Sequence, residues 1–150
     1  MASTSSATDQ LDLPDGGLLG AIVRLNMVVS DALETIASDA GLSFADYLVL
    51  GVVRRSPGQR SAPTEIAHVL GRTTGGVTLA LDRLEARGLL KRTRHADDGR
   101  RVVIELTPAG RRVATRVNDA LHEWEAAVAL PIPAERAVRT LDGLTEAING

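Results

Sequence analysis

The sequence predicts an all-α fold with a small β-wing, and three observations support that prediction. Apolar residues recur at spacings of three and four along most of the chain, which is the period of amphipathic helices. Residues 89–106 instead hold two apolar runs around a polar, glycine-containing tip, which is typical of a β-hairpin. The 150 residues are enough for one domain with helical extensions.

The composition excludes several classes of protein. A hydrophobic fraction of 44% and a charged fraction of 24% are those of an ordinary globular chain. The absence of cysteine excludes disulfides, thiolate catalysis and thiol redox sensing. The N-terminus lacks the basic and apolar regions of a secretory signal, and no apolar stretch approaches the roughly 20 residues of a membrane helix. We therefore expect a soluble, cytoplasmic protein with no membrane partner.

The N-terminal third is expected to contain an arm and two helices. Residues 1–13, rich in Ser, Thr and Asp, are expected to form a disordered arm. The apolar spacing over 18–41 predicts a long amphipathic helix. Ser43 suits the N-cap of a second helix that runs to Arg55, and Asp46 suits its positive N-terminal end.

Two short helices follow with almost no connection between them. Pro63 suits the start of the first, and Gly71 suits its end. Thr73 or Thr74 can cap the second, which is expected to end at Gly88. Helices separated by so few residues have the spacing of a helix-turn-helix.

The hairpin and two further helices complete the chain. The hairpin tip is residues 94–100, which carry several charged side chains. Thr107 followed by Pro108 is a strong start signal for a fifth helix, because Thr caps well and Pro is pre-organised for the first helical position. Pro131 and Pro133 break this helix, and a sixth helix finishes the chain.

The charge is distributed unevenly along the chain. Residues 54–116 hold 14 basic and 6 acidic side chains, a net charge of +8, whereas the remaining residues hold 3 basic and 13 acidic side chains, a net charge of −10. A basic middle between acidic ends is the electrostatic footprint of a polyanion-binding region. The alternative is a solvated surface whose sign drifts along the chain.

Several motifs in this basic middle also match a known family. They are Pro-Thr-Glu-Ile-Ala at 63–67, Leu-Gly at 70–71, Val-Thr at 77–78, the run Leu-Asp-Arg-Leu-Glu-Ala-Arg-Gly-Leu-Leu-Lys-Arg at 81–92, Asp-Gly-Arg-Arg at 98–101 and Leu-Thr-Pro-Ala-Gly at 106–110. In combination the chain resembles the MarR family of winged-helix transcription regulators. The resemblance implies a winged helix-turn-helix at 56–107, flanked by helical dimerisation regions at 14–55 and 108–150.

The resemblance also implies how the protein would contact double-stranded DNA. The N-terminal part of the fourth helix would read base edges in the major groove, and Arg100, fixed by Asp98, would enter the minor groove. Long basic side chains around them would contact phosphates. The residues expected to contact DNA are Arg54, Arg72, Thr73, Thr74, Gly75, Gly76, Thr78, Arg83, Arg94, Asp98, Arg100 and Arg101, and further phosphate contacts are expected from Arg55, Arg60 and Lys91.

Base readout by the fourth helix leaves alternatives open. Thr73 and Thr74 could serve only as caps. Gly75 and Gly76 each cost roughly 1 kcal/mol in a helix against Ala. Two explanations are open for these glycines: close approach of the backbone to DNA, or the tolerance of glycine in the first turn of a helix. Leu79 departs from the pattern of the family, in which many members carry a polar or basic side chain there.

The resemblance further implies a homodimer on a palindromic operator and a small aromatic or phenolic effector. Arg24, Tyr47, His68 and Trp124 are the candidate effector contacts. We expect no cofactor, no metal site and no catalytic residue, because the three His residues match no metal spacing and no Ser/His/Asp grouping is visible. A small enzyme and a winged-helix module that binds protein are the competing interpretations.

Overall fold

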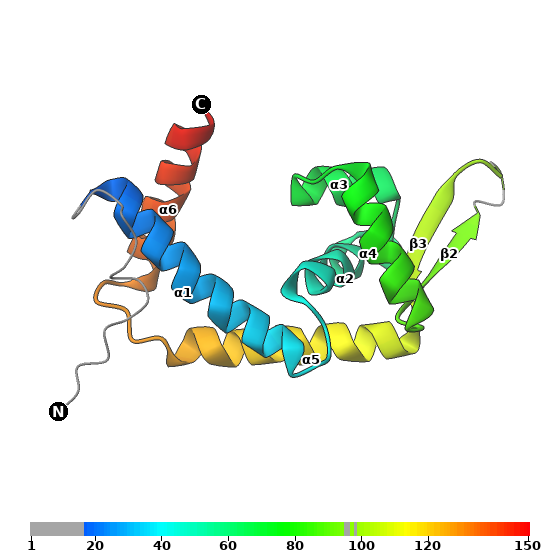
Figure 1. Cartoon of the computed structure of the whole chain (residues 1–150), viewed down its shortest axis with the longest axis horizontal. Coiled ribbons are helices and arrows are strands. Elements are labelled where there is room, and N and C mark those ends of the chain that lie inside the picture. Colours follow the sequence, from blue (N-terminus) through cyan, green and yellow to red (C-terminus); the bar gives the residue numbers. More distant parts are fainter. Residues whose placement is uncertain (1–16, 95–96, 98) are drawn as a thin grey trace.

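The computed structural model describes residues 17–94, 97 and 99–150, so the expected arm at 1–13 lies outside the described residues. The expected order of helices and hairpin is confirmed (Figure 1). The elements are α1 (Leu18–Ser38), α2 (Phe44–Arg55), the 3-10 turn η2 (Pro57–Gln59), β1 (Arg60–Ser61), α3 (Pro63–Leu70), α4 (Thr74–Ala86), β2 (Leu90–Arg94), β3 (Val102–Leu106), α5 (Pro108–Ala127) and α6 (Ala134–Asn149).

The strands form one antiparallel sheet in the order β1-β3-β2. The hairpin register runs from Leu90 opposite Leu106 to Arg94 opposite Val102. The sequence did not predict β1, which pairs Arg60 with Glu105 on the other edge of β3. Two residues are too few to produce a recognisable alternation, so β1 is defined by its partner strand and not by its own pattern.

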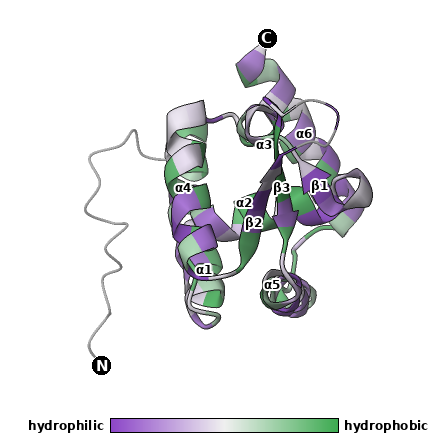
Figure 2. Ribbon diagram, turned by 90° about the vertical axis from the view of Figure 1, so that its right-hand side faces the viewer, coloured by the Kyte–Doolittle hydropathy of each residue, from purple (hydrophilic) through white to green (hydrophobic). Residues whose placement is uncertain are grey.

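The core lies inside the winged helix, and α2 passes through its centre. Fully buried side chains from α2, α3, α4, β3 and α5 meet there. They include Leu50, Val53, Ile66, Val77, Leu84, Ile104 and Val117. Viewed along α5, α4 lies beside the strands (Figure 2). This packing fixes the position of α4 relative to the wing.

The start of α5 is fastened to the turn between α4 and β2. Thr107 Oγ1 accepts a hydrogen bond from the Gly110 amide at 3.0 Å and donates one to the Gly88 carbonyl at 2.6 Å. The two segments are so close that a Cβ on Gly110 would lie 1.7 Å from the Leu89 carbonyl oxygen. Only glycine fits at position 110, which gives the Leu-Thr-Pro-Ala-Gly motif a steric reason.

The helical ends extend away from the winged helix. In Figure 1, α1 and α6 are both on the side of the molecule away from the wing, and α5 runs along the length of the molecule between the two parts. Only Gly20 and Ala37 are buried in α1, and no residue of α6 is buried. Within the part of the chain that the structure describes, none of the helices combines the length and the hydropathy that a membrane span requires.

Candidate nucleic-acid interface

The turn between α3 and α4 presents the start of α4 to solvent. Gly71 ends α3 with a φ of 60°, a conformation that strongly favours glycine. The Arg72 amide closes the turn by donating to the Ala67 carbonyl at 2.9 Å. Thr73 then caps α4, because its Oγ1 accepts from the Gly76 amide at 3.2 Å. The expectation that Thr73 or Thr74 caps this helix is confirmed for Thr73.

All the predicted base-reading positions of α4 are exposed. They are Thr73, Thr74, Gly75, Gly76 and Thr78. The Thr78 hydroxyl donates to the Thr74 carbonyl at 2.8 Å, so its proton is used within the helix while its oxygen can still accept. In the Thr73 hydroxyl the two roles are reversed. Its oxygen accepts from the Gly76 amide, and its proton is available for donation to a partner outside the protein.

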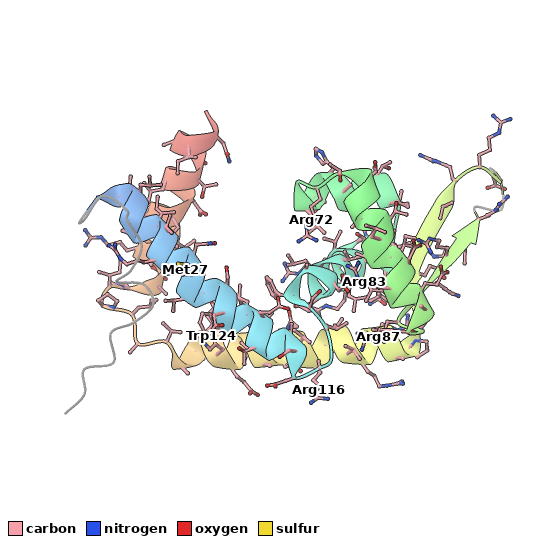
Figure 3. All side chains as sticks on the ribbon, in the orientation of Figure 1. Met27, Arg72, Arg83, Arg87, Arg116 and Trp124 are labelled. Carbon is pink, nitrogen blue, oxygen red and sulfur yellow. The ribbon has the colours of Figure 1, made fainter. Side chains whose placement is uncertain are left out.

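An ion pair holds α4 against α2. Arg83 donates from Nη2 to Asp46 Oδ1 at 2.6 Å and from Nε to Asp46 Oδ2 at 3.1 Å. The Asp46 side chain is only 9% exposed, and the hydrogen bond to it raises the pKa of Arg83. Arg83, labelled in Figure 3, was predicted to contact DNA, and that role stays a prediction. Its pairing with Asp46 could not be predicted, because an acidic residue in the first turn of a helix is already explained by the helix dipole.

A second set of ion pairs fastens the wing to α4. Arg92 of β2 donates to Asp82 at 2.5 Å and to Glu85, both on α4. The Arg92 amide also donates to Glu85 Oε1 at 3.2 Å. The recognition elements, α4 and the wing, are therefore joined by charged side chains as well as by the apolar core.

The wing contributes a basic groove. The groove has a volume of 890 Å³ and lies between the hairpin and the β1–α3 segment. Its lining includes the predicted DNA contacts Arg94, Arg100 and Arg101, together with Arg60 and Lys91. The structure therefore brings five of the predicted basic residues together. Asp98, the expected partner of Arg100, lies outside the described residues.

Glu105 lines this groove and forms ion pairs with two of its basic side chains. The carboxylate pairs with Lys91 Nζ at 3.1 Å and with Arg60. The hydrogen bond from Lys91, assisted by the positive charge of Arg60, holds the pKa of Glu105 below its ordinary value. Glu105 therefore positions these two cations. The wing-tip residues Arg94, Arg100 and Arg101 are exposed to solvent.

Two of the three remaining predicted DNA contacts, Arg72 and Arg54, have different surroundings. Arg72 is exposed on the α3–α4 turn, and its Nη1 lies 3.5 Å from the Ala45 carbonyl (Figure 3). Arg54 is directed toward α5, where its Nη2 donates to Asn118 Oδ1 at 2.7 Å. The Arg54 Nε is buried and has no hydrogen-bond partner among the described residues. The structure thus does not bring Arg54 to the face formed by α4 and the wing, and its DNA contact stays a prediction.

Comparison with known proteins identifies this arrangement. The model of the MarR family matches residues 40–101. The transcriptional regulator PecS of Dickeya dadantii is 30% identical over 139 residues, which cover 91% of this chain and 84% of PecS. The chain belongs to the MarR family.

Solved structures of MarR-family proteins share the fold. The PcaV regulator of Streptomyces coelicolor, solved in complex with its natural ligand, matches with a TM-score of 0.75 and 22% identity over 93% of this chain and 99% of PcaV. A mutant MarR of Escherichia coli, solved in complex with operator DNA, matches with a TM-score of 0.69 and 25% identity over 87% of this chain and 92% of that one. This MarR-family protein is a winged helix-turn-helix transcriptional regulator.

A cleft opens between the winged helix and α5 of this MarR-family chain. It has a volume of 660 Å³ and is lined by one face of α2, the end of α3 and the second half of α5. Phe44 and Tyr47 form a tilted pair in its wall, with ring centroids 5.8 Å apart. Burial raises the pKa of Tyr47, against the smaller opposite effect of Arg54 and Arg55.

Only one of the four predicted effector contacts lines this cleft. Tyr47 does, whereas Arg24, His68 and Trp124 are not part of its lining. His68 is exposed on α3, and Trp124 lies on α5 where α1 crosses it (Figure 3). Four further lining residues were not predicted as effector contacts, namely Phe44, Leu121, His122 and Glu125. Arg55 was predicted to contact phosphate, but it lines this cleft, and its DNA contact stays a prediction. The apolar members recur at helical spacing, so they were interpreted as core. Among the described residues no group of His, Asp and Glu could hold a metal ion.

Proposed function

We propose that this regulator binds a palindromic DNA site as a two-fold homodimer in the cytoplasm. The observation that carries the proposal is the pairing of two solvent-facing elements in one rigid unit. The first is the exposed, capped start of α4, and the second is the basic groove of the wing. An exposed helix start suits base edges in the major groove, and arginine side chains suit a narrow minor groove.

The dimer part of the proposal rests on the helical ends. Large apolar side chains are exposed on α1 and α6, including Leu25, Val28, Val138, Leu141 and Ile148. So many exposed large apolar side chains on two helices indicate an interface. A second copy would cover it symmetrically and place two copies of α4 for half-sites about one helical turn apart.

DNA binding is tested on the duplex that flanks the gene of this protein and on a random duplex, at several salt concentrations. The wild-type protein should bind with a steep salt slope and prefer one site near its gene. Arg100→Ala should weaken binding by roughly 1–3 kcal/mol, the value of one good specific contact. Arg72→Ala should weaken binding to both duplexes alike and lower the slope by about one unit. Arg139→Ala, on α6, is the matched control and should change neither.

Sedimentation of the free protein completes the test, since a dimer has twice the chain mass of 15.8 kDa. A monomer with a shallow salt slope and no preference between the duplexes would favour a protein-binding module or an enzyme instead. Wild-type affinity in Arg100→Ala would remove the wing from the proposed mechanism.

A second proposal concerns the cleft between α2 and α5. A mostly apolar cleft of 660 Å³ with a few polar groups at its edge fits a small aromatic or phenolic molecule. Phe44 and Tyr47 would contact its ring, and Arg55 or His122 would pair with an acidic substituent. A ligand that wedges between α2 and α5 would change the angle of the winged helix and release the DNA.

Titration calorimetry with benzoate, phenol and 4-hydroxybenzoate tests this second proposal. At least one compound should bind and lower the affinity for DNA, and Phe44→Ala and His122→Ala should weaken its binding. His68→Ala is the matched histidine control, because His68 lies outside the cleft. Equal loss in both histidine variants would argue against this cleft as the binding site.

A further inference from the structure

The outward face of α4 carries a leucine that the fold leaves uncovered. Leu79 is 62% exposed, whereas Val77, Ala80, Leu81 and Leu84 of the same helix are almost completely buried. The helical period places Leu79 one turn after Gly75, on the side of α4 opposite the buried residues. The outward face of α4 therefore presents an apolar side chain at Leu79 and no side chain at Gly75.

The stability of the protein does not require either residue. An exposed leucine adds little to the free energy of folding. A Cβ on Gly75 would meet nothing within 4 Å, and Gly75 is not among the glycines with positive φ. Alanine would therefore fit at position 75 and favour the helix. Figure 2 shows the start of α4 in the near-white colour of residues with intermediate hydropathy.

We infer that Leu79 contacts the 5-methyl group of a thymine in the major groove, so that the protein selects a thymine in each half-site. The inference rests on the DNA binding proposed above. Thymine is the only base that presents an apolar group in this groove, and a leucine side chain has no hydrogen-bonding atom with which to read another base. The missing side chain at Gly75 lets α4 approach the bases closely enough for Leu79 to reach the methyl group.

The surroundings of Leu79 fit this assignment. Thr74 and Thr78 of α4 are also exposed; the Thr74 hydroxyl can accept or donate at a base edge, and the Thr78 hydroxyl can accept there. Arg72, together with Arg60 and Lys91 of the wing groove, would contact phosphates and set the position of the helix without selecting sequence. In the major groove, selection then depends on a few short side chains of α4, of which Leu79 is the largest.

The test replaces single thymines of the bound site by deoxyuridine, which removes only the methyl group. With the wild-type protein, one symmetry-related thymine in each half-site should be sensitive, and each replacement should weaken binding roughly fourfold, the value of one buried methyl. Leu79→Ala should bind the thymine and the deoxyuridine duplexes equally. Val69→Ala is the matched control, because Val69 is 65% exposed on α3, and it should keep the full sensitivity.

The outcomes separate this inference from the proposed function. If the wild-type protein binds no duplex, the proposed function fails. If it binds but no thymine is sensitive, or if Leu79→Ala keeps the sensitivity, the inference is overturned. Should Leu79→Ala bind too weakly to measure, Leu79→Met retains an apolar side chain and should keep both binding and methyl sensitivity. Loss of that sensitivity in Leu79→Met would also overturn the inference.

Discussion

The winged helix and the helical ends differ in how completely each is packed within one chain. In the winged helix, α2, α3, α4 and the sheet share a closed core. Of the large exposed apolar side chains among the described residues, all but Val69, Leu79 and Val102 belong to α1, the loop after α5 or α6. The winged helix has a closed core in one chain, whereas the ends expose an apolar surface that a second copy would cover in the proposed dimer. The same kind of substitution should therefore have different consequences in the two regions.

The largest contrast is expected between two leucine truncations. Leu84→Ala, in the closed core, should lower the free energy of unfolding by roughly 2–5 kcal/mol at any protein concentration, because it leaves a cavity. Leu141→Ala, which is 50% exposed in one chain, should act only through dimerisation. Its destabilisation should therefore be larger in dilute than in concentrated protein. Urea unfolding at low and high protein concentration measures both variants. If the loss of stability in Leu141→Ala did not depend on protein concentration, the proposed difference between the two regions would be wrong.

The next contrast concerns the ion pair that holds α4 on α2. If Arg83 acts by positioning α4, then Asp46→Ala and Arg83→Ala should each weaken DNA binding roughly tenfold, and the double variant should cost no more than one of them. The salt slope of binding should stay unchanged in both. If Arg83 contacts a phosphate instead, Arg83→Ala alone should lower the slope by about one unit. Anisotropy titrations at several salt concentrations distinguish the two roles.

Local signals predicted the elements well, and pairings between distant residues were the part that they missed. The caps formed by Thr73 and Thr107 and the turn at Gly71 involve neighbours within a few residues, so the sequence alone indicated them. Asp46 and Arg83 are 37 residues apart, and nothing in either local pattern indicates the other.

Contacts between residues far apart in the sequence also decided where the predicted site residues lie. Arg54 belongs to the basic segment but is directed toward Asn118 of α5, 64 residues away. Charge counting along a chain gives the sign of a region and not the direction of a side chain. The cleft proposed for the effector could not be predicted for the same reason. Its walls come from α2, α3 and α5, and their apolar residues have the spacing of ordinary core faces.

A smaller contrast is expected between two helical glycines. Neither Gly75 of α4 nor Gly143 of α6 would bring a Cβ within 4 Å of another group. Gly143→Ala should raise the free energy of unfolding by up to about 1 kcal/mol and leave DNA binding unchanged. Gly75→Ala should raise stability less, since it lies in a first turn, and should weaken DNA binding by keeping α4 away from the bases. Thermal unfolding and DNA titration of both variants provide the test, and unchanged affinity in Gly75→Ala would argue against close approach.

The smallest effect should be a pH dependence that originates in the winged helix. In the unfolded chain Glu105 titrates near its ordinary value of 4.5, and in the folded chain Lys91 and Arg60 lower its pKa. A carboxylate whose pKa is lowered by folding stabilises the protein fully above its unfolded pKa, and this contribution is lost as the pH falls through the folded pKa.

Glu105→Gln should therefore be less stable than the wild-type protein at neutral pH, and the difference should shrink once the pH falls below about 4.5. Lys91→Met removes the largest cause of the lowered pKa, so it should lose part of the same pH-dependent stability. Urea unfolding from neutral to acidic pH measures all three proteins. A stability difference between Glu105→Gln and the wild-type protein that stays constant with pH would assign the role of Glu105 to packing, and the charge network of the wing groove would then not contribute to holding the winged helix together.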